Sequence, residues 1–315
     1  MFGGVFMALE TMDFDVIIIG GGPGGLSAAS WCAELGLRAV LFEKEDEFGG
    51  QLLRTFNAIR NHLGVEAENG REMRDIFLRQ VEKRGALLRR GTAIASVDLN
   101  KKSLILGDGT RCLASAIIIA AGVSRRKLGI PGESEFRGRG ILESGERAKN
   151  DVDGKRILIV GGGDAALENA LILGRNAERV YVVHRRNEFR ARDEFIRGCH
   201  NNEKIEFIMN TRANAIVGNS KVEAVELEDV LTGGLIRLAV DAVLIRIGEV
   251  ANIELFRGQI ATDADGFICV DHTCRTNLTD VFAIGDIANP LAPTISSAVG
   301  MGAIAAKAIA ANIRA

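Results

Sequence analysis

The sequence predicts an α/β protein with two Rossmann-like, three-layer ββα domains, the second inserted into a discontinuous first domain. Three observations predict this fold. An apolar strand runs into a glycine-rich turn and a helix at two places, in DVIIIGGGPGGLSAA and again in RILIVGGGDAALENA. Each copy leads to a further apolar strand, which completes a βαβ unit. The small-residue segment at the C-terminus is too short to form a domain by itself, so we expect it to complete the first one.

The domain boundaries follow from the segments that link these units. A glycine-rich, charged stretch, VSRRKLGIPGESEFRGRG, follows the first apolar core and is typical of a crossing between domains. A later apolar run, AVLIRIG, ends at Gly248. We therefore expect a first domain formed by residues 1–120 and 248–315, with the second domain at 121–247 between them.

The other elements can be read in order along the chain. Residues 15–43 and 156–184 are the two βαβ units, and NGREMRDIFLRQVEKRG has the amphipathic pattern of a helix. Another helix is expected near 189–201. Short strands are expected on both sides of a turn at 107–109. Further strands are expected in IEFIMN, ANAIVG, KVEAVELED, LIRLAV, ICVD and DVFAI. A final helix is expected in TISSAVGMGAIAAKAIAANI.

Composition narrows the class of protein. The chain has 315 residues, is 47% hydrophobic and 25% charged, and carries a net charge of −2, which is ordinary for two globular cores. Binding to nucleic acid or to a membrane surface needs a basic face, so neither partner is expected. No apolar run reaches the roughly 20 residues that span a bilayer. The N-terminal MFGGVFMALETMD lacks a basic leader and is expected to be a loose extension.

The five cysteines are scattered and odd in number, and no two of them form a C-x-x-C. This usage is typical of a reducing compartment, so a cytoplasmic protein without a disulfide framework is expected. The four histidines are not paired with cysteine at ligand spacing, and no metal site is expected.

The two glycine-rich turns have the pattern of dinucleotide-binding fingerprints, G-x-G-x-x-G and G-x-G-x-x-A. The glycines let the backbone turn tightly and approach a pyrophosphate, whose charge is favoured at a helix N-terminus. The residues expected at the cofactor are Gly20, Gly22, Pro23 and Gly25 in the first copy, and Gly161, Gly163, Asp164 and Ala165 in the second.

The residue that ends the next strand differs between the copies. Glu43, 23 residues after Gly20, can accept hydrogen bonds from both ribose hydroxyls and would repel a 2′-phosphate. In the second copy His184 has the same spacing from Gly161 and is followed by Arg185 and Arg186, with Arg190 one helical turn further on. Guanidinium groups pair bidentately with phosphate. The first copy is therefore expected to bind FAD or NAD, and the second NADPH.

Together these motifs resemble the low-molecular-weight thioredoxin reductases of the pyridine-nucleotide disulfide oxidoreductases, over essentially the whole chain. The segments that carry the resemblance are GGGPGGLSAA, FGGQL (48–52), RKLGIPGESEFRGRG (126–140), VGGGDAALENA (160–170), HRRNEFRA (184–191) and TDVFAIGD (279–286). The resemblance implies FAD in the first site, NADPH in the second and a homodimer.

The resemblance also implies individual FAD contacts. Gly50 and Gln51 would pack beside the flavin, and Asp286 would bind the ribityl chain and the pyrophosphate end. The segment that the family has as Arg-Gln-Ala is Pro293-Thr294-Ile295 here, and its Asn-Tyr-Pro-Gly is Asn61-His62-Leu63-Gly64, so His62 is a candidate neighbour of the flavin. The further residues expected at FAD are Lys44, Ala121, Gly122, Gly285, Thr294 and Ile295.

One departure from the family bears directly on function. Counted back from Gly161, the family's redox-active C-x-x-C falls on Ser144 and Arg147, and neither side chain can form a thiolate. Cys269 and Cys274 lie five residues apart and Cys32 follows the first turn, but cysteine commonly acts as a small buried apolar residue. The internal dithiol relay is therefore predicted to be absent.

The function predicted from the sequence is electron transfer from NADPH through FAD to an acceptor, which could be a small disulfide, a thioredoxin-like protein or a ferredoxin-like carrier. One alternative is a ferredoxin- or flavodoxin–NADP reductase of the thioredoxin-reductase-like type. Those enzymes carry a C-terminal extension over the flavin, whereas 29 residues follow Asp286 here. The other alternative is a redox-sensing or diflavin protein with another dinucleotide in the second site.

Overall fold

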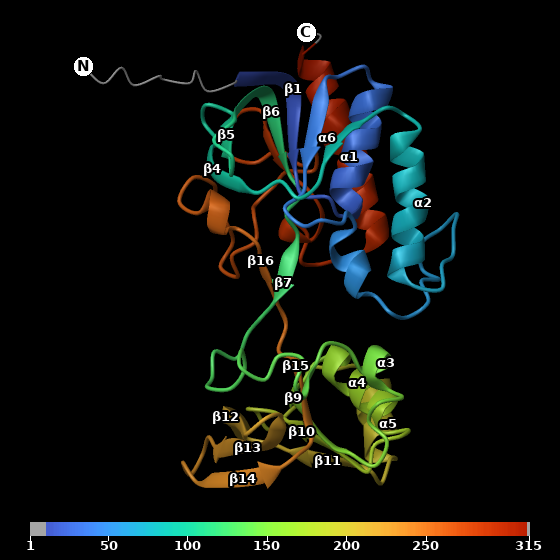
Figure 1. The fold of residues 1–315 in the computed structure, drawn as a ribbon, viewed down its shortest axis with the longest axis vertical. Coiled ribbons are helices and arrows are strands. Elements are labelled where there is room, and N and C mark those ends of the chain that lie inside the picture. The colour runs from blue at the N-terminus through green and yellow to red at the C-terminus, as the bar shows by residue number, and fades with distance from the viewer. Residues whose placement is uncertain (1–10, 314–315) are drawn as a thin grey trace, which may run out of the picture. The chain divides into compact units, whose positions relative to one another are not determined.

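A computed structural model describes residues 11–313, which form two compact units (Figure 1). The first unit combines the chain up to Ser124 with the chain from Val250, and the second unit is Arg125–Glu249. The second unit therefore begins and ends a few residues later than the predicted 121–247. The chain passes between the units in strands β7 (Val123–Arg125) and β16 (Glu249–Ala251), which pair as a two-stranded sheet.

The first unit is built on a seven-stranded sheet of order β3-β2-β1-β6-β5-β4, in which β17 also pairs with β6. Strand β6 has two partners on one edge, because its first residues pair with β5 and its last three pair with β17. Strands β1, β2, β3, β6 and β17 run parallel, whereas β5 runs antiparallel to both β4 and β6. The strands are β1 (Thr11–Ile19), β2 (Ala39–Phe42), β3 (Leu87–Arg89), β4 (Ile94–Asp98), β5 (Ser103–Leu106), β6 (Arg111–Ile119) and β17 (Val281–Ala283).

Helices α1 (Pro23–Glu34), α2 (Gly70–Glu82) and α6 (Ile295–Ile313) cover one face of this sheet (Figure 1). The side chains of β1 are apolar at successive positions and point alternately to the two faces of the sheet, so both faces are apolar. Val16 and Ile18 pack toward the helices. Ile17 and Ile19 pack toward β4, β5 and the return segment, residues 250–287, by which the chain comes back to this unit. Three short 3-10 helices complete the unit, η1 (Gly50–Arg54), η2 (Glu254–Phe256) and η3 (Gly285–Ile287).

Within residues 11–313, α6 is the helix that is long and apolar enough to cross a membrane by length and composition alone. Its buried residues Ala305, Ala306 and Ile309 belong to the same core as Leu26 and Ala29 of α1. The expected return of the C-terminal segment to the first domain is thus a packing of small residues on α1, which lets the two helices approach closely.

Two expectations for the first unit need correction. Strand β1 already begins at Thr11, inside the segment expected to be a loose extension, and the rest of that segment lies outside the described residues. The ICVD segment forms no extended strand and makes only an isolated bridge between Ile268 and Thr262. Ile268 of this segment is buried in the core on the face of the sheet that Ile17 and Ile19 occupy, which explains the strand-like pattern.

The second unit has three layers, as predicted. Its central sheet, of order β11-β10-β9-β15-β8, is entirely parallel. Helices α3 (Gly145–Ala148), α4 (Asp164–Leu173) and α5 (Asp193–His200) pack on one face, and an antiparallel sheet of order β12-β13-β14 covers the other. The strands are β8 (Ile141–Leu142), β9 (Arg156–Gly161), β10 (Arg179–Val183), β11 (Ile205–Ile208), β12 (Thr211–Gly218), β13 (Val222–Asp229), β14 (Leu235–Ala239) and β15 (Ala242–Arg246).

Candidate dinucleotide sites

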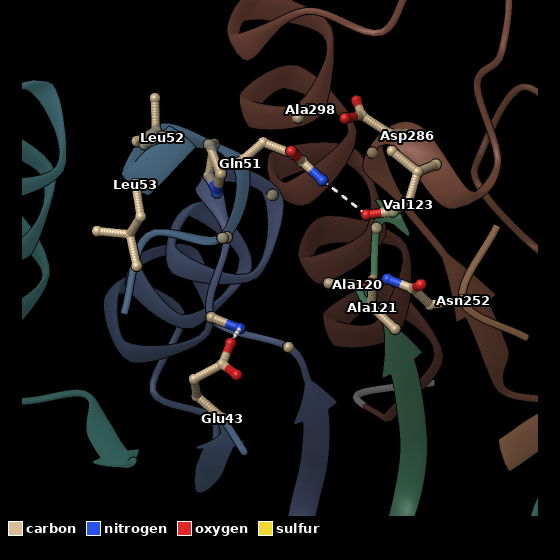
Figure 2. A pocket seen from close by; sticks show the side chains of 18 of the residues that line it. Glu43, Gln51, Leu52, Leu53, Ala120, Ala121, Val123, Asn252, Asp286 and Ala298 are labelled. Atoms are coloured by element: carbon tan, nitrogen blue, oxygen red, sulfur yellow. Dashed lines mark hydrogen bonds between the residues drawn. The ribbon is translucent and has the colours of Figure 1, made fainter. Parts of the chain in front are cut away.

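The first unit contains a cleft of about 550 Å³ at the carboxyl ends of its parallel strands (Figure 2). Strands β1, β2, β6 and β17 end in register, since Ile19 pairs with both Phe42 and Ile119, and Ala283 pairs with Ile119. The next residue of each strand therefore reaches the cleft. These four residues are Gly20, Glu43, Ala120 and Ile284. The position agrees with the rule that ligands of parallel sheets bind beyond the carboxyl ends of the strands.

The glycine-rich turn is shaped to leave room on the ligand side and none on the protein side. A Cβ added to Gly22 would meet no atom within 4 Å, whereas one on Gly25 would lie 1.9 Å from the carbonyl oxygen of Gly20. Gly22 is the N-cap of α1 and makes no side-chain cap, so the first N–H groups of the helix remain available to an anion.

Glu43 is fixed and almost fully buried at the end of β2, with 8% of its surface exposed. Its Oε2 accepts a hydrogen bond of 2.7 Å from the amide of Gly21, and its Oε1 accepts one of 3.0 Å from the amide of Glu45. Each oxygen keeps a further lone pair for a ligand. Glu45, Asp46 and Glu47 line the cleft beside it, and this concentration of negative charge disfavours a phosphorylated ribose.

At the other end of the cleft, polar side chains fix the backbone that follows β6 (Figure 2). Gln51, on η1, donates a hydrogen bond of 2.6 Å to the carbonyl of Val123. Asn252 donates one of 2.7 Å to the carbonyl of Ala121 and accepts one of 2.7 Å from the hydroxyl of Ser124. Asn252 could not be predicted from the sequence, because it belongs to no motif and is over a hundred residues away from its partners.

The structure brings together in one cleft all the residues expected at FAD except Gly25 and His62. Thirteen of them line the cleft: Gly20, Gly22, Pro23, Glu43, Lys44, Gly50, Gln51, Ala121, Gly122, Gly285, Asp286, Thr294 and Ile295. Gly25 does not line it and instead allows α1 to pack closely on the turn.

His62 lies outside the residues that line the cleft. It lies in a neighbouring cavity between α1 and α2. Its Nδ1 is 3.0 Å from the hydroxyl of Ser296, and its ring makes an edge contact with Phe77 at a centroid distance of 5.7 Å. The loop directs the imidazole toward the helices, and its place beside the flavin stays a prediction.

The second unit repeats the turn at the carboxyl end of β9. A Cβ on Gly163 would meet no atom within 4 Å, and Gly163 is the N-cap of α4 without a side-chain cap. Asp164, the first residue of α4, is held by Arg192, whose amide and Nε donate to its two oxygens at 2.7 and 2.8 Å. The hydrogen bond from that amide is the main cause that lowers the pKa of Asp164. Arg192 thus offsets a negative charge where a pyrophosphate would bind.

His184 packs beneath this turn and does not project from it. A Cβ on Gly162 would lie 2.4 Å from its ring, which stacks on Phe189 at a centroid distance of 5.6 Å. Its Nε2 is buried and has no hydrogen-bond partner among residues 11–313. Burial, together with the charges of nearby arginines, lowers the pKa of His184, which keeps the imidazole neutral near pH 7.

Arg185, Arg186 and Arg190 are exposed and surround the end of β10. None of the three guanidinium groups forms an ion pair within the described chain, whereas those of Arg192 and Arg212 do. The amide of Arg190 donates a hydrogen bond of 2.8 Å to the carbonyl of Gly162, which ties this segment to the glycine turn. Three unpaired cations beside one helix N-terminus can hold a phosphate group.

Arg246, which no motif of the sequence explains, ends β15 next to the same turn. It pairs with Gly161, and a Cβ on Gly161 would lie 2.1 Å from its carbonyl oxygen. Its guanidinium donates to the carbonyls of Glu143 at 2.7 Å and Ile245 at 2.8 Å. Burial, and then the charge of Arg125, lowers the pKa of Arg246 to about 10, so the group remains protonated at neutral pH.

The cysteines do not form a site. Cys32, Cys112, Cys199 and Cys274 are buried, and Cys269 is exposed. Burial raises the pKa of Cys32 to about 12 and those of Cys199 and Cys274 to about 11. These thiols are therefore protonated at neutral pH and are poor nucleophiles. Ser144 is the N-cap of α3, and Arg147 on that helix is exposed and paired with Glu143.

Comparisons with known proteins identify the family of this chain. Residues 14–302 match the family model described as pyridine nucleotide-disulphide oxidoreductase. The thioredoxin reductase of Mycolicibacterium smegmatis is 37% identical over 294 residues, which cover 92% of this chain and 94% of that protein.

Two solved thioredoxin reductases have the same fold. The Lactococcus lactis enzyme in its FR conformation aligns with a TM-score of 0.81 and 33% identity, covering 94% of this chain and 97% of that one. The T. acidophilum enzyme aligns with a TM-score of 0.81 and 27% identity, covering 96% and 99%. The chain therefore belongs to the pyridine nucleotide-disulphide oxidoreductase family and is a thioredoxin-reductase-like, NAD(P)H-dependent flavoprotein oxidoreductase, a family whose cofactors are FAD and NADPH.

Proposed function

We propose that this protein passes electrons from NADPH through FAD to an external acceptor, without an internal dithiol. The observation that carries the proposal is the contrast between two equivalent positions. The first glycine turn faces a buried glutamate in an acidic cleft, whereas the strand end of the second βαβ unit is followed by three exposed arginines that form no ion pair within residues 11–313. The first arrangement suits a ribose with a free 2′-hydroxyl, and the second suits a 2′-phosphate.

The residues of the cleft in the first unit fit FAD. The N–H groups at the start of α1 would bind the pyrophosphate, and Glu43 would accept the ribose hydroxyls. Gln51 and Asn252 keep the backbone after β6 in place, so that the flavin end of the cleft has a fixed wall. Asp286, on η3, lies where the ribityl chain would pass.

In the second unit the start of α4 would bind the pyrophosphate of NADPH, and Arg185, Arg186 and Arg190 would bind its 2′-phosphate. When bound, NADPH supplies a hydride that the flavin accepts with both electrons, which leaves NADP⁺. This step needs no protein acid or base, so the contribution of the chain is binding, orientation and exclusion of water.

The sequence has no C-x-x-C, and Ser144 and Arg147 stand where the resemblance places that motif. We infer that the acceptor takes its electrons from the flavin directly. The acceptor is a disulfide, on a small molecule or on a thioredoxin-like protein, or a ferredoxin-like electron carrier. We also propose a cytoplasmic homodimer, as the resemblance to thioredoxin reductases implies.

The test is anaerobic reduction of the purified protein. We expect NADPH to bleach the absorbance of bound FAD within milliseconds to seconds and NADH to do so far more slowly. Reduced protein should then be mixed with oxidised thioredoxin, a low-molecular-weight disulfide, ferredoxin and flavodoxin, and its reoxidation followed. Flavin that NADPH does not reduce, or a second bound FAD in place of NADPH, would contradict the proposal and favour a redox-sensing or diflavin protein.

A further inference from the structure

The parallel sheet of the second unit has a switch point at β9. In the order β11-β10-β9-β15-β8, the chain runs from β9 to β10 on one side, whereas β15 lies on the other side. Dinucleotides bind across the crevice at such a point, beyond the carboxyl ends of the strands. Because the arginines that would hold the 2′-phosphate follow β10, the adenosine half belongs to the β10 side. The other half, which carries the nicotinamide, belongs to the β15 side.

Two cations gather on the β15 side. Arg246 is the last residue of β15 and is paired with Gly161 of the turn itself. Arg125 and Arg246 donate to the same acceptor, the carbonyl of Glu143, which follows β8. The carboxylate of Glu143 is paired with Arg147, and Glu249 is the carboxylate whose charge acts on Arg246. Arg246 and Arg125 thus bring two guanidinium groups to this end of the sheet.

We propose that Arg246, with Arg125, makes the second site select the reduced dinucleotide over the oxidised one. The inference rests on the proposed binding of NADPH in this unit. The nicotinamide ring is neutral in NADPH and carries a positive charge in NADP⁺. A fixed positive charge beside the ring therefore leaves the binding of NADPH almost unchanged and weakens that of NADP⁺. Arg246 thus acts as a specificity residue that promotes release of the oxidised product.

The test compares ligands that differ in ring charge and undergo no hydride transfer. Isothermal titration calorimetry on the oxidised, FAD-loaded protein would use three ligands. They are NADP⁺, the redox-inactive analogue tetrahydro-NADPH, whose nicotinamide ring is uncharged, and 2′,5′-ADP, which lacks the ring. For wild type we expect tighter binding of tetrahydro-NADPH than of NADP⁺. For Arg246→Gln we expect the ratio of the two dissociation constants to narrow by about tenfold, through tighter binding of NADP⁺. Binding of 2′,5′-ADP should not change.

Three further variants make the result specific. Arg246→Lys keeps the charge and should keep the wild-type ratio. Arg125→Gln removes the other cation without altering β15 and should narrow the ratio in the same direction, which tests the inference even if Arg246→Gln does not fold. Arg179→Gln is the matched control, because Arg179 also donates to a carbonyl, that of Glu203, but is the first residue of β10 and lies at the amino ends of the parallel strands, away from Arg246.

The outcomes separate the inference from the proposed function. If Arg246→Gln weakens NADP⁺ and tetrahydro-NADPH equally, Arg246 is a phosphate contact and the inference is wrong, while the proposed binding of NADPH stands. An unchanged ratio in both Arg246→Gln and Arg125→Gln also overturns the inference. If wild type does not bind 2′,5′-ADP, the assignment of the second site fails and the inference fails with it.

Discussion

Glu43 and His184-Arg185-Arg186 occupy equivalent positions after the second strand of each βαβ unit, and their side chains create opposite environments. Glu43 is nearly buried and held by two amides, so its charge is fixed toward the cleft. Arg185 and Arg186 are exposed and unpaired within residues 11–313, so their charges remain available to an anion. We therefore propose that a difference of a few residues at one strand end decides which dinucleotide each unit prefers.

At this scale we first predict that Glu43→Gln weakens binding of FAD. The amide keeps one acceptor but loses the charge, and a hydrogen bond to a charged group contributes about 1.5–3 kcal/mol, so affinity should fall about tenfold or more. The dissociation constant of FAD for the apoprotein, measured by quenching of flavin fluorescence, checks this. Glu82→Gln, at the exposed end of α2, is the control and should bind FAD as wild type does. Equal affinities for wild type and Glu43→Gln would refute the role of Glu43.

The second prediction concerns the phosphate. Replacing Arg185 and Arg186 together with Ala should weaken NADPH about ten- to hundred-fold and hardly change NADH, because only NADPH carries the 2′-phosphate. Arg175→Ala is the control, since Arg175 is equally exposed but follows the far end of α4. Calorimetric titrations with NADP⁺ and NAD⁺ give the same comparison without hydride transfer. If the double variant loses NAD⁺ and NADP⁺ in equal proportion, the arginines do not read the 2′-phosphate.

At the scale of elements, the two glycine-rich turns combine a packing requirement with an open face. Gly25 lies against the backbone of Gly20, and Gly22 faces the cleft with no neighbour within 4 Å of its Cβ position. We therefore predict that Gly25→Ala destabilises the apoprotein by about 1–3 kcal/mol, as overpacking does, whereas Gly22→Ala leaves its thermal unfolding temperature unchanged.

Gly22→Ala should instead weaken FAD, because the added methyl group occupies the approach of the pyrophosphate to the start of α1. Thermal unfolding of both apoproteins, followed by titration with FAD, separates the two roles. The prediction is wrong if Gly22→Ala lowers the unfolding temperature as much as Gly25→Ala does. It is also wrong if Gly22→Ala binds FAD like the wild type.

The elements themselves could largely be predicted, because most of them carry a local signal. The amphipathic helix α2 has Met73, Phe77 and Val81 on one face and an N-cap at Asn69, and it was expected within one turn of its ends. Strands β12, β13 and β14 were expected too, and the first residues of β12 and β13 alternate between buried and exposed. Segments without such a signal were missed: β8 and α3 are short and depend on contacts with β15 and with Asn169.

At the scale of the whole molecule, the discontinuous first unit shows what the sequence could and could not give. The return of the C-terminal segment was expected because a helix of small residues needs a partner, and α6 packs on α1. The contribution of Asn252 was not expected, because the return segment reaches the cleft through a residue outside any motif. The direction of the His62 side chain could not be predicted either, because the direction of a loop side chain depends on tertiary contacts, here with Ser296 and Phe77.

The cysteine thiols are mostly buried and lie in both units of the chain. Four of the five cysteines are buried, and they are distributed over both units on different elements. Cys274 is buried beneath α6, with its Sγ 3.8 Å from the carbonyl of Met301, whereas Cys269 is exposed. A dithiol that accepts electrons from a flavin needs an accessible thiolate. We therefore predict that the bound flavin is the only two-electron centre of this protein.

Anaerobic reductive titration of the FAD-loaded protein tests this central claim most directly. We predict that reduction is complete after two electrons per FAD, with no long-wavelength thiolate–flavin charge-transfer band. Uptake of four electrons per FAD, falling to two in Cys269→Ser or Cys274→Ser, would show a dithiol in a new place and contradict direct transfer from the flavin to the acceptor.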